Sequence, residues 1–250
     1  MKVAVFNVKF SENLGDGILA QCLEKALCSQ SRVEVETIDL AGRTDFGATS
    51  AHRRIAVRVL HVLPFFARRL AVTHALRSRL RVLGDEWDDR IADANAVVIG
   101  GGNLFQDDDL NFPLKIGTLL DCVRRSGKPL AIHAVGVGGT WSRRAHELFH
   151  RVENTNLVYL SVRDAASRDN WRRHFPGGQI PAVVPDPGLF ARDLVTTGAV
   201  ASTNDGERVT GICVTDPLIL VRHSGRRTRG ICFGTVGEYV DLVRLLVSRG

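Results

Sequence analysis

The 250-residue sequence contains no run of apolar residues that reaches the ~18 needed for a membrane-spanning helix. It opens on a strand-like pattern at residues 1–6 and lacks the basic and apolar regions of a secretory signal. We therefore expect a cytoplasmic protein. The length and the 44% hydrophobic content fit a soluble globular protein with one large α/β domain, or one domain and part of another.

The sequence also lacks paired cysteines. Its five cysteines are widely spaced, and none belongs to a C-x-x-C pair. Zinc sites need closer ligand pairs, and disulfide frameworks belong to short secreted chains. We predict no metal site, and reduced, buried thiols with a structural role at Cys22, Cys28, Cys122, Cys213 and Cys232.

Several catalytic motifs are absent: H-E-x-x-H, G-x-S-x-G and the P-loop. The net charge of +6 permits anionic partners such as phosphates, acidic glycans, a lipid surface or nucleic acid. Because aromatic residues make up only 6% of the chain and no RNA- or DNA-binding motif is present, we do not expect a nucleic-acid partner.

Residues 51–83 lack acidic side chains but contain eight arginines interleaved with apolar residues. This pattern is typical of one or two basic amphipathic helices, here broken near Pro64. Two interpretations stay open. We favour a helix whose apolar side packs on the core while its basic side is solvated. The alternative is a peripheral contact with an anionic membrane surface, such as the inner face of the cell membrane.

Strand patterns alternate with helical patterns along residues 1–195. This alternation is typical of βαβ units and predicts an α/β domain with a parallel sheet. Strands are expected at 3–8, 33–40, 96–99, 129–135, 157–162 and 182–184, and helices at 17–29, 114–126, 143–152 and 165–175.

Residues 196–208 are small, polar and aperiodic, so we predict a linker there. It would join an N-terminal α/β domain, residues 1–195, to a second α/β unit, residues 209–250, with a strand at 209–214 and a helix at 236–248. One strand and one helix cannot bury a core. We therefore expect the second α/β domain to be incomplete in this sequence.

The first candidate site follows the first strand, in the sequence Asn13-Leu-Gly15-Asp16. We predict that Gly15 allows a tight turn and that Asp16 is the N-cap of the next helix. A helix start offers free N–H groups and a positive dipole end to an anion. A plain capped turn is the alternative.

Three glycines, Gly100–Gly102, end the third predicted strand, and Asn103, Gln106 and Asp107 follow them. Such glycines allow positive φ and close approach to bare N–H groups. A second glycine turn, with Gly136 and Gly138, ends the next strand. Two such turns at consecutive strand ends favour a shared ligand groove over separate packing roles. The glycines do not match G-x-G-x-x-G, and we identify no acidic residue at the expected spacing after an adjacent second strand, so a dinucleotide site is poorly supported.

Two further strand ends carry charged residues. We predict that Arg163 holds a carboxylate or phosphate, although a structural pair with Asp164 is an equal alternative. Asp164 is expected to cap the following helix, with Ser167 directed back to the turn. Asp186, between two prolines, is either a base or acceptor for a sugar hydroxyl, or a turn-former. His133, inside a strand pattern, is expected to be a satisfied core histidine.

Taken in order, these pieces resemble the polysaccharide pyruvyl transferase family over residues 3–190. The resemblance rests on Asn13-Leu-Gly15-Asp16, the stretch 98–107, Gly136-Val-Gly138, the stretch 161–167 and Asp186-Pro187. It implies two Rossmann-like domains that face each other across a cleft, as in GT-B glycosyltransferases. It also implies transfer of a pyruvyl group from phosphoenolpyruvate, with no other cofactor, to two hydroxyls of a sugar or lipid-linked oligosaccharide that serves as a precursor of a cell-surface polysaccharide.

By this resemblance Arg163 is the catalytic cation, because it matches the arginine of the family's Arg-Asp motif. The resemblance implies that further donor-binding and proton-transferring residues, a histidine among them, belong to the second domain. A GT-B glycosyltransferase that uses a nucleotide sugar and a non-catalytic binding half remain as alternatives. The residues expected to bind substrate are Asn13, Gly15, Asp16, Gly101, Gly102, Asn103, Asp107, Gly136, Gly138 and Asp186.

Overall fold

The structure is a computed structural model that describes residues 1–46, 64–107, 109–194 and 235–249. The chain divides into two compact units, Met1–Thr196 and Thr197–Gly250. In the second unit the structure describes α8 (Val236–Arg249), where the sequence predicts a helix. The predicted linker at 196–208 and strand at 209–214 lie outside the described residues, so the predicted domain boundaries stay a prediction.

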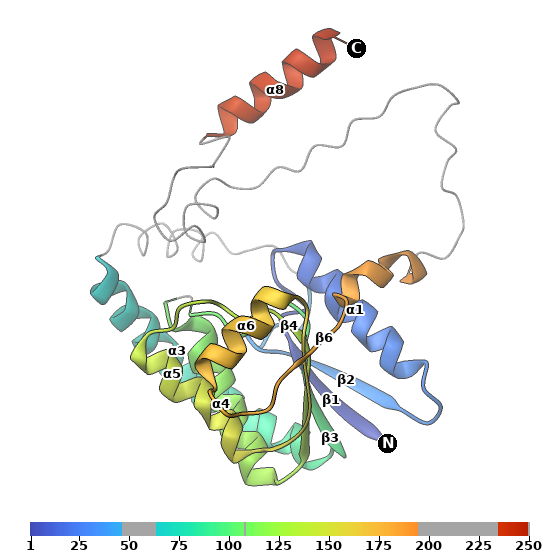
Figure 1. Cartoon of the computed structure of the whole chain (residues 1–250), viewed down its shortest axis with the longest axis vertical. Coiled ribbons are helices and arrows are strands. Elements are labelled where there is room, and N and C mark those ends of the chain that lie inside the picture. Colours follow the sequence, from blue (N-terminus) through green and yellow to red (C-terminus); the bar gives the residue numbers. More distant parts are fainter. Residues whose placement is uncertain (47–63, 108, 195–234, 250) are drawn as a thin grey trace. The chain divides into compact units, whose positions relative to one another are not determined.

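The first unit is built on a six-stranded, all-parallel sheet with the strand order β2-β1-β3-β4-β5-β6. This is the parallel α/β arrangement that the alternating patterns predict, and it is Rossmann-like (Figure 1). The strands are β1 (Lys2–Asn7), β2 (Glu34–Asp39), β3 (Ala96–Gly100), β4 (Pro129–Val135), β5 (Asn156–Val162) and β6 (Ala182–Val183).

Helices connect the strands in the order that a doubly wound sheet requires. The predicted helix at 143–152 is in fact two elements, because α5 ends at Phe149 and a 3-10 helix follows it. The helices of this unit are α1 (Leu14–Cys28), α3 (Phe65–Ala92), α4 (Asn111–Ser126), α5 (Arg143–Phe149), η1 (His150–Asn154), α6 (Ala165–His174) and η2 (Pro187–Leu194).

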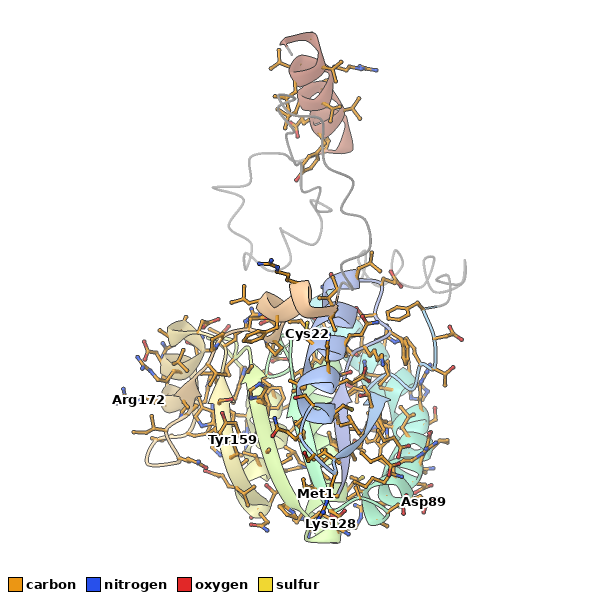
Figure 2. The ribbon with its side chains drawn as sticks, turned by 90° about the vertical axis from the view of Figure 1, so that its right-hand side faces the viewer. Met1, Cys22, Asp89, Lys128, Tyr159 and Arg172 are labelled. Atoms are coloured by element: carbon orange, nitrogen blue, oxygen red, sulfur yellow. The ribbon has the colours of Figure 1, made fainter. Side chains whose placement is uncertain are left out.

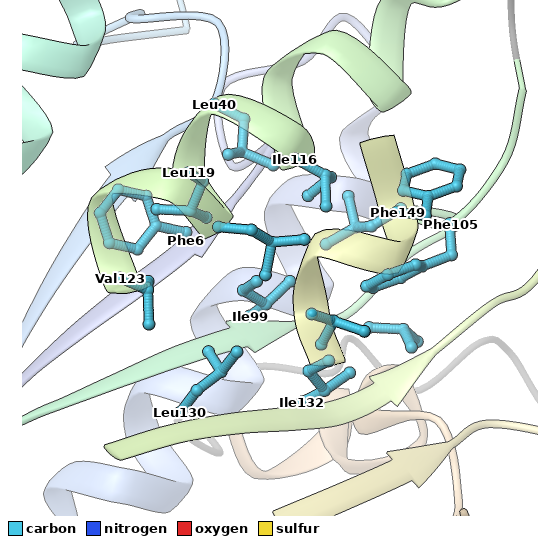
Figure 3. Close-up of a cluster of buried hydrophobic side chains, with 14 of the residues drawn as sticks. Phe6, Leu40, Ile99, Phe105, Ile116, Leu119, Val123, Leu130, Ile132 and Phe149 are labelled. Atoms are coloured by element: carbon cyan, nitrogen blue, oxygen red, sulfur yellow. The ribbon is translucent and has the colours of Figure 1, made fainter. Parts of the chain in front are cut away.

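The two faces of the sheet differ in how they are covered. Alternate strand residues such as Phe6, Ile99 and Ile132 point into the larger core, beneath α3, α4, α5 and α6 (Figure 3). The opposite alternate residues, including Val5 and Val98, pack against Leu23 of α1. Figure 2 shows α1 crossing this second face, and Tyr159 of β5 is exposed. The main core therefore lies on one side of the sheet, and α1 covers the opposite side near β1 and β3, with η2 packed against α1.

An irregularity interrupts β4 just before its glycine turn. The pairing of β4 with β5 shifts register between Ile132 and Val135, and Ala134 has a φ of 50°. A left-handed conformation at a residue with a side chain costs about 1–2 kcal/mol. The hydroxyl of Ser161 accepts a hydrogen bond from the Ala134 amide at 3.1 Å, so β5 helps to hold the strained residue. The bulge redirects the chain into the second glycine turn.

The basic segment predicted at 51–83 is described only from Pro64 onward, and residues 51–63 lie outside the described residues. Pro64 occupies the N-cap position of α3, a single helix that continues to Ala92. Its inner face, with Leu76, Leu80 and Leu83, packs on the core. The favoured interpretation, an apolar side on the core, is confirmed for Leu76–Leu83, and the alternative of a membrane contact stays a prediction.

Two smaller predictions also have outcomes. Cys22 and Cys122 are buried free thiols, but the prediction for Cys28 is wrong, because it lies exposed in the last turn of α1. Within the described ranges, no helix combines the length and apolar character needed to cross a membrane.

Candidate active site

The candidate site lies at the carboxyl edge of the sheet, between β1 and β3. The connection after β1 runs to β2 on one side of this point, and the connection after β3 runs to β4 on the other side. In the order 2-1-3-4-5, ligands bind at this switch point between the first and third strands. The loop after β1 and the glycines after β3 both reach this point. Asp16, Leu19 and Gly100–Gly102 line a narrow crevice between α1 and the sheet.

The first loop differs from the prediction in how the helix begins. Asn13, not Asp16, is the N-cap of α1, and its side-chain oxygen accepts a hydrogen bond from the Gly15 amide at 3.1 Å. Gly15 is the second residue of the helix and does not form a tight turn. The prediction failed because two glycines within four residues indicate a turn, whereas Asn13 caps the helix before them.

Asp16 lies in the first turn of α1 and faces the Gly100–Gly102 turn. Its carboxylate accepts hydrogen bonds from the Ser11 hydroxyl at 2.5 Å and the Asn13 amide at 3.3 Å. Burial raises the pKa of Asp16, although the Ser11 bond and the charges of Arg43 and Arg163 act in the opposite direction. A half-buried carboxylate with a raised pKa at a ligand edge is a candidate for proton transfer or hydroxyl binding.

The two glycine turns are bonded directly to each other. Gly101 and Gly102 both have a φ of +76°, which confirms the predicted left-handed turn. The Gly136 amide donates to the Gly102 carbonyl at 2.8 Å, and the Phe105 amide donates to the Gly136 carbonyl at 3.2 Å. The glycines thus allow two loops to approach closely and form one continuous wall.

Asn103 and Arg163 meet over Gly136. A Cβ atom at position 136 would lie 2.0 Å from Asn103 Oδ1 and 3.2 Å from Arg163 Nε. The absence of a side chain at Gly136 therefore makes room for both polar groups. Asn103 is exposed, and within the described part of the chain its amide makes no hydrogen bond, so it is available to a ligand.

The guanidinium of Arg163 is flanked by carboxylates. Its Nε lies 3.4 Å from Asp164 Oδ2, and its Nη1 lies 3.8 Å from Asp186 Oδ2. The sequence left open whether Arg163 faces a ligand or pairs with Asp164. In the structure it pairs with Asp164 and also lies at the candidate site, so the two roles are compatible. Burial acts to raise the pKa of Asp164, but the bonds from Ser167 and the charge of Arg163 outweigh it and leave that pKa below its ordinary value.

Asp107 and Asp186 each hold local backbone. The Asp107 carboxylate accepts from the Leu110 amide at 3.1 Å and from the Ser142 amide at 2.8 Å. Asp186 accepts from the Gly188 amide at 2.9 Å, as a turn-former does, while its other oxygen faces Arg163. Asp107 therefore orders the loop before α5, and Asp186 remains at the site.

One face of α6 holds the second glycine turn. Asp164 caps this helix, and the Ser167 hydroxyl accepts from the Val137 amide at 3.1 Å, so both predictions are confirmed. Asn170 donates to the Val137 carbonyl at 2.8 Å, and His174 Nε2 lies 2.9 Å from the Gly138 carbonyl oxygen. Sequence reasoning missed Asn170 and His174, although their spacing of three and seven residues from Ser167 marks a single helix face.

A cluster of rings lies behind this face. His174 stacks on Trp141 with 3.7 Å between ring centroids, and its Nδ1 lies 3.3 Å from His146 Nε2. Because Gly138 offers His174 only an oxygen acceptor, His174 Nε2 carries the proton and Nδ1 accepts from His146. Burial lowers the pKa of His174, and neighbouring His146, Arg173 and His150 lower it further. The neutral ring is therefore the form that supports the turn.

Two other residues bear on the sequence predictions. His133 is half-buried, with its Nδ1 3.3 Å from the Ser161 hydroxyl, as expected for a satisfied histidine, and burial lowers its pKa. Asp39 ends β2, which pairs with β1 and precedes the Gly100–Gly102 turn in the chain, so it is not the acidic residue that a dinucleotide fingerprint needs after those glycines. Its carboxylate accepts from the Phe10 and Ala41 amides and pairs with Arg43, so it stabilises the loops and is not directed at a ribose.

Within the residues that the structure describes, no group of three histidine, cysteine or carboxylate side chains is arranged to hold a metal ion. The arrangement is instead a polar edge with three carboxylates around one guanidinium, backed by bare glycine backbone. Its elements suit hydrogen bonding to hydroxyl groups more than binding of a multiply charged anion.

The fold and the site thus define a Rossmann-like α/β protein with a ligand site at the carboxyl edge of its sheet. The family model for polysaccharide pyruvyl transferase matches residues 13–222. The chain belongs to the polysaccharide pyruvyl transferase family, and the family implies transferase activity on a sugar or polysaccharide acceptor.

Comparisons with individual proteins add less. A search of the curated proteins found no significant match. Among solved structures, the chain is similar to an azoreductase from Bacillus anthracis str. Sterne, with 12% identity over 77% of this chain and 90% of that chain and a TM-score of 0.31.

Proposed function

We propose that the protein transfers the pyruvyl group of phosphoenolpyruvate to two hydroxyls of a sugar in a cell-surface polysaccharide precursor. Family membership over residues 13–222 carries this proposal. The polar edge built by Asn103, Arg163 and Asp186 supports it, because such groups bind and orient hydroxyls.

The reaction needs both an acid and a base. One sugar hydroxyl adds to C2 of the enol while a proton is delivered to the methylene carbon, which becomes the methyl group. The second hydroxyl then displaces phosphate from C2 and gives up its proton, so that the products are the cyclic ketal and free phosphate. Asp16, whose pKa burial raises, is our candidate to accept a hydroxyl proton.

The balance of charges at this edge indicates which of the two substrates, donor or acceptor, it binds. Asp164 and Asp186 flank Arg163, and the charge of Arg163 also acts on Asp16, so this edge does not carry the excess of positive charge that phosphoenolpyruvate requires. We infer that it mainly holds the acceptor, with Arg163 reaching the donor carboxylate or phosphate. Other cations must complete the donor site.

Ligand-dependent melting tests the proposal. Phosphoenolpyruvate should raise the melting temperature, Arg163→Ala should abolish the shift, and Arg163→Lys should restore only part of it, since lysine cannot form a bidentate fork. Arg172→Ala, an exposed position of α6, is the matched control and should keep the full shift.

A direct assay follows phosphate release from phosphoenolpyruvate in the presence of sugars. Release that depends on sugar, with a product carrying a pyruvyl ketal by mass spectrometry, supports the proposal. Stabilisation by a nucleotide sugar such as UDP-glucose but not by phosphoenolpyruvate would replace it with a glycosyltransferase.

A further inference from the structure

The first half of α3 extends past the core that anchors its second half. Pro64–Arg79 contains no buried residue among those whose exposure is described, and Leu76 is its partly buried contact with the core. In Figure 1 the first turns of α3 stand clear of the sheet and of the other helices of this unit. Among the residues of α3 whose exposure is described, the buried ones lie in its second half: Leu80, Leu83, Gly84, Trp87 and Ile91.

An outward stripe runs along this extension and continues into the first core-anchored turn of α3. Leu70, His74, Arg77 and Arg81 follow one another at intervals of four, three and four residues, which places them on one helix face. All four are exposed, Leu70 by 71%. Arg77 and Arg81 make no ion pair or hydrogen bond with any residue in the described ranges.

Other arginines of α3 are engaged. Arg79 donates to the Ala41 carbonyl at 2.5 Å, and Arg90 pairs with Glu36 and Glu86. The contrast shows that the stripe arginines are not needed to hold the helix in place.

Charge is also segregated along the helix. Residues 64–84 contain five arginines and no acidic residue, whereas residues 85–92 contain four acidic residues and one arginine. Arg53, Arg54 and Arg58 precede the helix in the sequence. The extended half of α3 is therefore a basic, partly apolar surface, and the acidic half lies over the core.

We propose that the Leu70–Arg81 stripe of α3 binds the headgroup layer of an anionic membrane. Arginines attract anionic phosphodiester headgroups, each adding roughly fivefold to the binding constant, and an exposed leucine can enter between them. Nucleic acid fits less well, because the stripe has no phenylalanine, tyrosine or tryptophan and offers a base only the His74 ring on which to stack. The inference holds whatever the site at the sheet edge transfers.

Vesicle co-sedimentation tests it on the 250-residue chain without any substrate. Vesicles of phosphatidylcholine with about one-third phosphatidylglycerol should bind the protein at low salt, and pure phosphatidylcholine should not. Binding should weaken steeply as the salt concentration rises, because surface charges are screened. No binding to the anionic vesicles at low salt overturns the proposal.

Charge reversal separates the stripe from net charge. Arg77→Glu with Arg81→Glu lowers the net charge from +6 to +2, since each reversal removes two charges, and should weaken binding roughly 25-fold or more. Arg124→Glu with Arg172→Glu changes the net charge equally at exposed positions of α4 and α6 and should leave most of the binding. Equal losses in both variants would show that net charge alone acts, which overturns the proposal.

A third variant and a competitor complete the design. Leu70→Gln should cost a few-fold in affinity that high salt does not remove, because apolar contact is not screened. If duplex DNA binds more tightly than anionic vesicles and the Arg77–Arg81 variant abolishes both, the stripe is a nucleic-acid surface and the membrane assignment is wrong. Melting temperatures of all variants verify that they are folded.

Discussion

Asn103 Oδ1 occupies the place that a side chain at Gly136 would take, 2.0 Å from the position of its Cβ. The two residues come from the loops after β3 and β4, and both loops end at the same sheet edge. The exposed side-chain amide of Asn103 and the guanidinium of Arg163 therefore both lie next to the Cα of Gly136 at one point of the candidate site.

Gly136→Ala should impair ligand binding more than stability. The exposed Asn103 amide can move aside, so we expect a loss in the free energy of unfolding of no more than about 1 kcal/mol, but Asn103 and Arg163 would both be displaced. The measurement is donor-dependent melting beside urea unfolding. Gly138→Ala meets only atoms at 3.5 Å or more and serves as control; if it impairs binding equally, displacement at Gly136 is not the cause.

Gly100→Ala should act in the opposite way and destabilise the fold. A Cβ there would lie 2.5 Å from Leu23 Cδ2 of α1, and overpacking of this kind costs roughly 1–3 kcal/mol. Urea unfolding should show the loss, and Leu23→Ala in the same chain should relieve part of the clash. An unchanged unfolding midpoint would mean that α1 can shift at no cost.

Asp16→Asn should raise the stability of the fold and lower the activity. Burial raises the pKa of Asp16, so the folded state favours the protonated acid, and that contribution is present at low pH and lost as pH rises through the folded-state pKa. At neutral pH the buried, ionised carboxylate of Asp16 therefore destabilises the folded state, and the neutral amide of the variant should raise the melting temperature modestly. Sugar-dependent phosphate release should fall sharply. A variant that retains full activity excludes Asp16 as the base.

Stability should decrease as pH falls below the ordinary histidine range. Burial lowers the pKa of His133, His146 and His174 from 6.5. Below that pH the unfolded chain binds more protons than the folded one, so the folded state loses stability with each step down. His174→Gln, which can still donate to Gly138, should flatten the fall in melting temperature between about pH 7.5 and pH 5.5. His74→Gln, at an exposed position, should not.

The element order could be predicted because it depends on local patterns. Pro129–Val135 is β4 with the predicted bounds, since its residues alternate between the main core and the opposite face. The start of α1 was missed because Gly15 and Gly17 resemble a turn. Gly17 is accommodated in the helix because Phe46, from a distant loop, lies where its side chain would be, and a local pattern cannot show that contact.

The site could be predicted only in part, for the same reason. Strand ends place Arg163 and Asp186 at one edge without further information. The contact of Asn103 with Gly136 depends on the pairing of two loops 33 positions apart (136 − 103), and the role of Asn170 depends on which face α6 presents to the sheet. Spacing along the chain shows that Ser167, Asn170 and His174 share one helix face, but it does not show which part of the protein that face contacts.

The hydrogen bonds from α6 to the second glycine turn join the helix and the turn into one rigid unit. Val137 and Gly138 are tied to Ser167, Asn170 and His174 on the helix and to Phe105 on the neighbouring loop. Such a turn cannot open as a separate flap, because it opens only with the helix that carries it. In amide hydrogen exchange, the amides of the turn should therefore exchange as slowly as those in the interior of α6. The turn would then be a rigid part of the substrate site and not a mobile lid.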